Sequence, residues 1–465
     1  MSEYEEFIER KRLLVAPSGF EAAEVSGMAY PFQADIIRWA CRMGRAAVFA
    51  DCGLGKSLIQ LECARLMVEH SGKPALILAP LAVAQQTVRE GEKFGIHCRY
   101  LRQDDGAPGI VVANYEMLEH FDARRFGTVI LDESSILKAH TGKMRNLIID
   151  TFSSTPYRLA FTATPSPNDF TELGNHCEFL GVMRRTEMLS MFFAHDGGST
   201  QDWRIKGHAQ KDFWKWVCGW AVMIRSPADL GYETSDFVLP PMRIEKSVIA
   251  ADHSQAKKSG FLFEMEAQTL QERRAAKRGT ISARSKACAD LIASEPGEQW
   301  LTWCNLNDEG DALAALIPGA VQVSGSDTRE HKESSIAGFT EGRIRVLVSK
   351  PSMFGHGLNL QNCARMAFVG LSDSFEEFYQ AVRRCWRFGQ KREVAVHVIT
   401  SELEGAVVAN IQRKEADMVK MIAGMLEEMR AEMRANVRGT QRNVVEYEPT
   451  KKLKIPAWLT SEVRT

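Results

Sequence analysis

The segment 50–57, which reads Ala-Asp-Cys-Gly-Leu-Gly-Lys-Ser, constrains the fold of this chain more than any other stretch. An apolar run at 46–49 leads into it and predicts a buried strand, and an amphipathic run that stops at Ser71-Gly72 follows it and predicts a helix. A strand, a glycine loop and a helix in this order hold a nucleotide's phosphates, because the glycines let backbone N–H groups turn toward the anion and the helix N-terminus adds partial positive charge. The segment therefore predicts a nucleotide-binding α/β domain.

Individual residues of this loop have expected roles. Lys56 is expected to reach the β- and γ-phosphates, and the hydroxyl of Ser57 is expected to hold Mg²⁺. The remaining nucleotide contacts of the loop are assigned to Asp51, Gly53, Leu54 and Gly55. The usual pattern has glycine at its first position, which is Ala50 here, and the alternative interpretation is a chance glycine turn before a helix.

The composition excludes several classes of protein. The chain has 465 residues, enough for two or three domains, and its 45% apolar and 25% charged residues are typical of a soluble globular protein. A formal net charge of −1 argues against a protein that coats nucleic acid through bulk charge, although it allows a local basic groove. Ten cysteines without a Cys-x-x-Cys pair indicate reduced thiols, and no signal peptide or membrane-crossing apolar run is present, so we expect a cytoplasmic protein without membrane contact.

Apolar runs alternate with helical patterns after the glycine loop. Strands are predicted at 75–79, 110–113, 128–131 and 157–161, and each run ends in a cluster of polar residues or at a proline. Such alternation predicts a parallel sheet with helices on both faces, in which ligands lie at the carboxyl ends of the strands. The polar clusters are therefore candidates for one shared site.

Asp132 and Glu133 directly follow the predicted strand 128–131. An aspartate at this place can bind Mg²⁺, directly or through water, and the adjacent glutamate can polarise the attacking water as general base. The alternative is an acidic pair that starts a helix, where carboxylates are favoured by the helix dipole. The glycine loop upstream, on a neighbouring strand, favours the catalytic interpretation.

The second half of the chain has strand patterns but no second phosphate loop. Strands are predicted at 300–304, 321–323, 346–348, 366–369 and 394–399. On a helix, Gln380, Arg384 and Arg387 would share one face, and two planar, permanently charged guanidinium groups suit a triphosphate. An arginine supplied by a second domain stabilises phosphoryl transfer, so this half is predicted to complete the site of the first; the alternative is a basic surface helix.

Four other segments leave alternatives open. Gln33 could read an adenine edge or could be a surface glutamine, and the aromatic run 213–220 favours the core of a helical insertion over base stacking. The basic stretch 252–293 predicts a helix whose face is either solvated or in contact with nucleic-acid phosphates. A methionine stripe within a long C-terminal helix predicts a packing face, formed by Met418, Met421, Met425 and Met429.

Together these motifs resemble those of the superfamily-2 helicases, and most closely the Swi/Snf-type branch of DNA translocases. The resemblance rests on the glutamine motif and motifs I, Ia, Ib, II, III, V and VI, at 30–33, 50–57, 78–80, 113–116, 132–135, 162–165, 355–360 and 380–390. Ser134 and Ser135 depart from the family's usual Ala-His or Ala-Asp, and Arg383 and Trp386 replace its usual glycine and histidine. With no recognisable chromodomain, bromodomain, nuclease or zinc module, the chain resembles the small motors of bacteria and their phages.

The resemblance implies two RecA-like domains, each a doubly wound parallel sheet, that face each other across one ATP with Mg²⁺. The implied catalytic residues are Lys56, Asp132, Glu133, Arg384 and Arg387, and the implied metal ligands are Ser57 and Asp132. Added to the loop, the implied nucleotide contacts are Gln33, Gly357 and Gln380. The expected segments are an N-terminal extension, RecA-like domain 1, a helical insertion, a linking helical region, RecA-like domain 2, and a C-terminal helix and tail, at 1–26, 27–174, 175–245, 246–295, 296–400 and 401–465.

The function that this resemblance implies is a DNA-stimulated ATPase that translocates on double-stranded DNA. DNA is the expected partner and RNA the alternative, and the sequence leaves protein partners unknown. A strand-separating DNA or RNA helicase would use the same catalytic residues. The alternative of another class is an ATP-switched regulatory subunit of a nuclease or restriction-type complex, against which Glu133 and the paired arginines speak.

Overall fold

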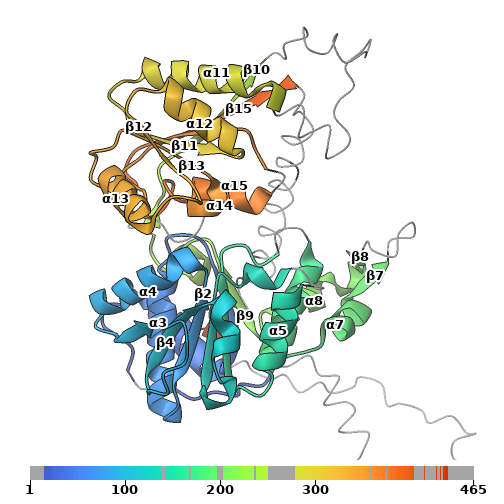
Figure 1. Ribbon diagram of the computed structural model, residues 1–465. Coiled ribbons are helices and arrows are strands. Elements are labelled where there is room, and N and C mark those ends of the chain that lie inside the picture. The colour runs from blue at the N-terminus through green and yellow to red at the C-terminus, as the bar shows by residue number, and fades with distance from the viewer. Residues whose placement is uncertain are drawn as a thin grey trace, which may run out of the picture.

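The computed structural model describes residues 15–22, 24–138, 142–166, 169–195, 203–234, 237–249, 278–354, 359–372, 374–402, 413, 426, 430 and 433–437. Two lobes lie one above the other, and each is built on its own parallel sheet (Figure 1). We call the lobe that carries the glycine loop the first domain and the other lobe the second domain.

The sheet of the first domain has the strand order β3-β4-β2-β5-β6-β1-β9, and every neighbouring pair is parallel. Its strands in chain order are β1 (Arg45–Ala50), β2 (Ala75–Ala79), β3 (Cys98–Tyr100), β4 (Ile110–Asn114), β5 (Thr128–Asp132), β6 (Tyr157–Thr162) and β9 (Ala221–Ile224). Strands β2, β4 and β5 are buried at every position, as expected when helices cover both faces of a parallel sheet. All of the strands predicted for this half of the chain are confirmed.

The helices of the first domain include α2 (Pro31–Met43), α3 (Lys56–Ser71), α4 (Leu81–Lys93), α5 (Lys143–Thr151) and α6 (Leu173–Leu180). Helix α3 follows the glycine loop directly and ends where predicted, because Gly72 adopts the left-handed conformation, with φ of 67°, that terminates many helices. Because α3 begins at Lys56, directly after the loop that follows β1, its N-terminus lies at the carboxyl edge of the sheet, where the phosphates were predicted to bind.

The sheet of the second domain has the order β10-β15-β14-β11-β13-β12 and is also parallel throughout. Its strands are β10 (Met242–Ile249), β11 (Trp300–Cys304), β12 (Ala320–Val323), β13 (Val346–Ser349), β14 (Arg365–Val369) and β15 (Val394–Ser401). The helices that accompany them are α11 (Ile281–Ser294), α12 (Asn307–Leu316), α13 (Arg329–Thr340), α14 (Pro351–Phe354) and α15 (Phe375–Val382). The predicted fold class, two doubly wound parallel α/β domains, is confirmed.

The segment 175–245 differs from the helical insertion that the sequence suggested. It contains helices α7 (Arg185–Phe192) and α8 (Gln210–Val217), but also an antiparallel pair, β7 (Phe193–His195) and β8 (Trp203–Ile205). It also contains β9, which pairs with β1 at the edge of the first sheet, and the start of β10, which crosses the expected boundary at 245. A four-residue apolar run next to a helical pattern carries no period of its own, so its pairing with a distant strand decided its structure.

The aromatic run belongs to the core. Phe213, Trp214, Trp216 and Trp220 are each at most 2% exposed and pack on one another. Base stacking by these rings is therefore excluded, and the core interpretation is confirmed.

The basic stretch is only partly described, since residues 250–277 lie outside the described ranges. Within α11, Arg284 is completely buried and pairs with the equally buried Glu309 at 2.8 Å, so neither of the two predicted roles holds for it. A buried guanidinium needs such a partner, because an unpaired charge in the core is very costly. Lys286 on the same helix is exposed and pairs with Asp290.

The C-terminal methionine stripe lies outside the described residues. The described part of this segment returns to the first domain: Met433 and Val437 are buried, and the Met433 sulfur accepts a hydrogen bond from the backbone N of Met223 on β9 at 3.4 Å. All ten cysteines are free thiols. Within the described ranges, no helix is long and apolar enough to cross a membrane.

Candidate nucleotide site

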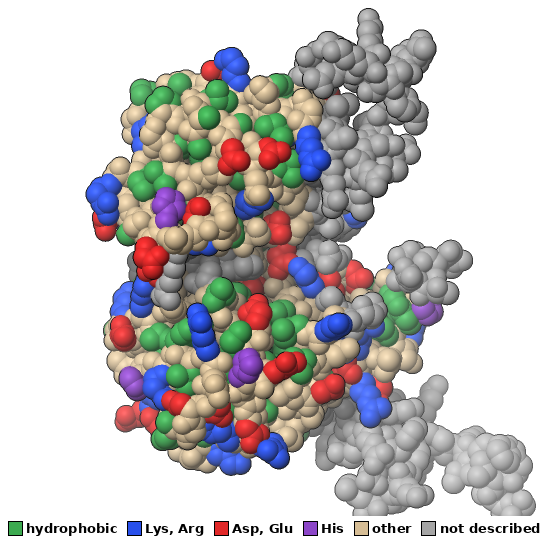
Figure 2. All heavy atoms as spheres, in the orientation of Figure 1, with side chains coloured by type: hydrophobic (Ala, Val, Ile, Leu, Met, Phe, Trp, Pro, Cys, Tyr) green, Lys and Arg blue, Asp and Glu red, His purple; other side chains and the backbone are tan. Residues whose placement is uncertain are grey.

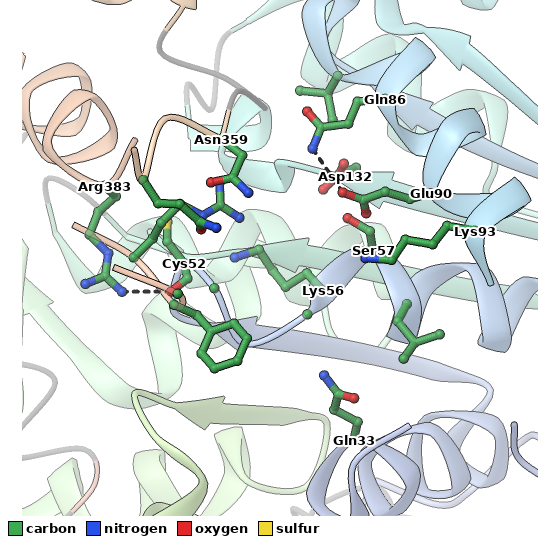
Figure 3. A pocket seen from close by; sticks show the side chains of 18 of the residues that line it. Gln33, Cys52, Lys56, Ser57, Gln86, Glu90, Lys93, Asp132, Asn359 and Arg383 are labelled. Atoms are coloured by element: carbon green, nitrogen blue, oxygen red, sulfur yellow. Dashed lines mark hydrogen bonds between the residues drawn. The ribbon is translucent and has the colours of Figure 1, made fainter. Parts of the chain in front are cut away.

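A cavity of about 490 Å³ lies between the two domains at the carboxyl edge of the first sheet (Figure 3). Residues of both domains line it, and the predicted site residues that it brings together are Gln33, Gly53, Gly55, Lys56, Ser57, Asp132, Glu133, Arg384 and Arg387. Asp51, Leu54 and Gln380 do not line the cavity, and Gly357 lies outside the described residues. The site therefore combines the glycine loop of one domain with the arginines of the other.

The glycine loop has the backbone geometry that only glycine adopts without strain. Gly53 and Gly55 have φ values of 91° and 77°, in the left-handed region. The ammonium of Lys56 donates to the carbonyl oxygen of Ala50 at 2.7 Å, so it is folded over the loop and reaches into the cavity (Figure 3). A loop held in this way presents backbone N–H groups and one ammonium to the same space.

Gln33 fixes the position of the glycine loop. Its side-chain nitrogen donates to the carbonyl oxygen of Leu54 at 2.9 Å, and its side-chain oxygen accepts from the backbone N of Tyr30 at the same distance. The side chain is only 3% exposed, so it is not a surface glutamine. A Cβ atom on Gly55 would lie 2.2 Å from the Gln33 amide nitrogen, so any other residue there would displace this side chain from its hydrogen bond to Leu54.

Asp132 ends β5 and is held by two hydrogen bonds. The amide nitrogen of Gln60, on α3, donates to its carboxylate at 2.8 Å, and the hydroxyl of Tyr115 donates to its backbone oxygen at 2.7 Å. Burial raises the pKa of Asp132 to about 6, although the hydrogen bond from Gln60 lowers it. Because the carboxylate is buried and its hydrogen bond comes from a neutral amide, a cation bound at this point would stabilise its charged form.

The oxygen donors at this edge fit Mg²⁺. The Ser57 hydroxyl and the Asp132 carboxylate both line the cavity, and hard oxygen ligands are those that Mg²⁺ prefers. Within the described ranges no group of three or more His, Cys, Asp or Glu side chains could hold a metal alone. Mg²⁺ usually keeps several waters and shares one or two protein ligands with substrate phosphates, which suits a site of this kind.

Glu133 has a strained backbone. Its φ of 56° is the only positive value at a non-glycine residue in the described chain, and such outliers cluster at active sites. Its carboxylate accepts hydrogen bonds from the hydroxyl of Thr162, at the end of β6, at 2.6 Å and from that of Ser135 at 3.1 Å. The end of β6 and the 3₁₀ turn that follows β5 thus hold this carboxylate, which lines the cavity.

The two serines after Glu133 have distinct partners. Ser134 is buried and its hydroxyl lies 3.1 Å from Nε2 of His176 on α6, which is also completely buried. Burial lowers the pKa of His176 to about 4, so the imidazole is neutral at physiological pH. The 3₁₀ helix that begins at Ser134 ends at Lys138, which forms an ion pair with Glu376 of α15 in the second domain.

The two arginines predicted for the triphosphate approach from the second domain. Arg384 and Arg387 follow α15 and line the cavity opposite the glycine loop. Burial lowers the pKa of both guanidinium groups, that of Arg384 to about 10, so both remain charged at neutral pH. Gln380 is buried below them, and its backbone oxygen accepts from Nε of Arg384 at 3.1 Å.

Several residues of the cavity were not predicted as part of a site. Gln86, Glu90 and Lys93 reach it from α4, and the rings of Tyr30, Phe237 and Phe388 line its other end. The rings of Phe237 and Phe388 stack with centroids 4.9 Å apart, although Phe237 also packs on Tyr30 of the first domain and Phe388 belongs to the second. Of these six residues, Tyr30 and Phe388 carried a sequence signal, because they lie inside the glutamine motif and motif VI.

Asp51 does not line the cavity, but Arg383, one of its partners, does. Its carboxylate lies 2.8 Å from a guanidinium nitrogen of Arg383 and accepts a hydrogen bond from the hydroxyl of Tyr379 at 2.6 Å. Both partners belong to the second domain, so Asp51 contacts the arginine segment, and its contact with the nucleotide stays a prediction.

Comparisons with known proteins agree with this architecture. The family model described as DEAD/DEAH box helicase matches residues 30–173, and the model described as helicase conserved C-terminal domain matches residues 283–389. Protein p41 of Acyrthosiphon pisum secondary endosymbiont phage 1 is 22% identical over 438 residues, which cover 80% of this chain and 92% of the relative.

Two solved structures match most of this chain. A fragment assigned as an HsdR subunit of a type I restriction enzyme from Vibrio vulnificus YJ016 is 15% identical, with a TM-score of 0.51 over 82% of this chain and 64% of that one. The Sulfolobus solfataricus SWI2/SNF2 ATPase core in complex with dsDNA is 17% identical, with a TM-score of 0.41 over 90% of this chain and 99% of that one.

Proposed function

This chain is a superfamily-2 helicase, an ATP-hydrolysing motor that acts on nucleic acid, and from this premise we propose that it translocates on double-stranded DNA. The observation that carries the proposal is the shared cavity, in which Lys56 of the first domain faces Arg384 and Arg387 of the second. Support for duplex DNA comes from the order of the motifs and from the resemblance of 380–390 to motif VI of the Swi/Snf-type translocases.

In the proposed reaction the two domains divide the triphosphate between them. Lys56 and the loop N–H groups bind the β- and γ-phosphates, while Arg384 and Arg387 stabilise the charge that develops on the transferred γ-phosphoryl group. Glu133, aimed by Thr162 and Ser135, orients the attacking water and accepts its proton. Mg²⁺, held by Ser57 and Asp132, would neutralise part of the phosphate charge.

Hydrolysis can drive movement because the γ-phosphate is the group that the two domains share. With ATP bound, the arginines of the second domain are attracted to the first, and after hydrolysis and phosphate release that attraction is lost. Cyclic closing and opening then displaces two surfaces that hold the same nucleic acid. On the face shown in Figure 2, basic and acidic side chains are interspersed over both lobes, which fits backbone contact in a local groove better than binding by bulk charge.

Turnover of ATP should be measured alone and with single-stranded DNA, duplex DNA and RNA. We expect duplex DNA to stimulate turnover most, and equal turnover with and without DNA would refute the translocase. Displacement of a third strand from a triplex, without separation of the duplex, distinguishes translocation from strand separation. Strand separation without triplex displacement would favour the helicase alternative.

Two variants test the assigned roles. Glu133→Gln should bind ATP without hydrolysing it, and Arg387→Ala should lose turnover while the Lys56 loop still binds nucleotide. Arg392→Ala is the matched control, because this arginine of the same segment pairs with Glu298 and does not line the cavity. Normal turnover in Glu133→Gln would remove Glu133 from the role of general base.

A further inference from the structure

The two domains are joined by a contact at the edge of the nucleotide cavity, where Cys52 and Arg383 line the cavity and Asp51 and Tyr379 do not. Asp51, in the glycine loop, receives a guanidinium nitrogen of Arg383 at 2.8 Å and the hydroxyl of Tyr379 at 2.6 Å. The same Arg383 nitrogen donates to the carbonyl oxygen of Cys52 at 2.9 Å (Figure 3). We call Asp51, Cys52, Tyr379 and Arg383 the clasp.

The clasp is buried. The side chains of Arg383 and Asp51 are 2% and 14% exposed, and the guanidinium lies over the ring of Trp386, with its carbon 4.8 Å from the ring centroid. Each of these two buried charges is stabilised mainly by the other, because a charge left alone in the interior would keep its full desolvation cost. Burial opposes the charge on Arg383, but its interactions with Asp51, Tyr379 and Cys52 together outweigh burial and raise the pKa of Arg383.

Backbone contact reinforces the clasp on the cavity side. A Cβ atom on Gly53 would lie 2.9 Å from the backbone N of Phe388, so the second domain touches the glycine loop at the residue where only glycine fits. Trp386 also donates from its indole nitrogen to the carbonyl oxygen of Pro240 at 2.8 Å. The arginine segment is therefore seated on the loop in a fixed register.

The position of the clasp in the sequence gives it a function. Arg383 immediately precedes Arg384 and lies four residues before Arg387, and Asp51 lies five residues before Lys56. One ion pair thus connects the two backbone segments that carry the cations of the site. Lys56, Arg384 and Arg387 repel one another when no triphosphate is bound to offset their positive charges. The carboxylate of Asp51 holds the two segments together against this repulsion.

We propose that Arg383 is a positioning residue: through Asp51 it holds the arginine segment on the glycine loop before ATP binds, so that ATP meets a preformed site. This inference rests on the proposed function, since it concerns the ATP site of the motor. It also explains why the glycine that the family usually has at this position is an arginine here. Preorganisation of this kind lowers the cost of bringing the cationic groups together around the substrate.

The test uses the full chain with Arg383→Gln, Asp51→Asn and the double variant. The first readout is the radius of gyration from X-ray scattering without nucleotide, and the second is the KM and kcat for ATP with saturating DNA. Each single variant should enlarge the nucleotide-free particle and raise KM about tenfold, with a much smaller change in kcat. In the double variant the fold-increase in KM should be smaller than the product of the two single fold-increases, because neither charge is left buried without its partner.

Unchanged size and unchanged KM in Arg383→Gln would overturn the proposal, and so would strictly additive single effects. A purely structural role would lower the unfolding temperature without the rise in KM. If Arg383→Gln does not fold, Tyr379→Phe removes only the 2.6 Å hydrogen bond and should raise KM by a smaller factor. If the wild type hydrolyses no ATP with any nucleic acid, the proposed function fails, and the scattering comparison still decides the clasp.

Discussion

Thr162→Val tests whether Glu133 is the general base through a residue that does not line the nucleotide cavity. The Thr162 side chain is completely buried at the end of β6, and its hydroxyl donates to the Glu133 carboxylate at 2.6 Å. The same hydroxyl accepts from the backbone N of Thr164 at 3.0 Å. Valine has nearly the same shape, so the substitution removes both hydrogen bonds without leaving a large cavity.

The expected loss follows from the hydrogen bond to the carboxylate. A hydrogen bond to a charged group contributes about 1.5–3 kcal/mol, and about 1.4 kcal/mol corresponds to a tenfold change in rate. Glu133 also has a left-handed backbone that other contacts must hold in place. We therefore expect kcat to fall about 10- to 100-fold, while KM for ATP stays close to that of the wild type.

The assay is steady-state ATP turnover with saturating DNA, together with equilibrium unfolding of each variant. Thr128→Val is the matched control, because this buried threonine of β5 in the same sheet has a hydroxyl without a hydrogen-bond partner among the described residues. The double variant Glu133→Gln with Thr162→Val should turn over ATP no more slowly than Glu133→Gln alone, because both substitutions act on the same general base. Normal kcat in Thr162→Val, or an equal loss in Thr128→Val, would refute the reasoning.

Three further outcomes are expected. His176 has a pKa of about 4 in the fold and about 6.5 when unfolded, so the unfolded chain binds a proton that the folded chain does not. As pH falls between these values, the wild type should lose up to about 3 kcal/mol of its free energy of unfolding. In denaturant titrations His176→Gln should lack this loss, and parallel pH profiles of the two proteins would contradict the prediction. Glu309→Gln leaves Arg284 buried without its ion pair and should cost about 3–5 kcal/mol in chemical unfolding, so a loss below about 1 kcal/mol would be inconsistent with this burial. Gly55→Ala forces a side chain into a left-handed conformation 2.2 Å from the Gln33 amide, so calorimetry should show at least about tenfold weaker binding of a non-hydrolysable ATP analogue, and wild-type affinity would show that the loop yields easily.

Local patterns were enough for the main architecture. The apolar runs before the glycine loop, before Asp132 and before Thr162 have the length and composition of buried parallel strands, and each is a strand of the first sheet. Since parallel strands end at one edge, the same patterns placed Lys56, Asp132 and Glu133 near one another. The strands β9 and β10 were not predicted, because each is defined by its pairing with a distant strand.

The roles of single side chains depended on contacts between residues far apart in the chain. The sequence marked Asp51 as a loop residue and Arg383 only as a departure from the family pattern, and the structure joins them across the domain boundary. It likewise removed Arg284 from the surface by pairing it with Glu309 in the core.

By itself, therefore, the sequence determined the two parallel sheets and the chemistry at their carboxyl edges, because strand period, helix termini and phosphate loops are encoded within a few residues. Only the tertiary structure decided which carboxylates line the cavity, which contact a guanidinium, and which other side chains face the cavity. Those choices depend on burial and on distances between segments hundreds of residues apart, and no local pattern contains them.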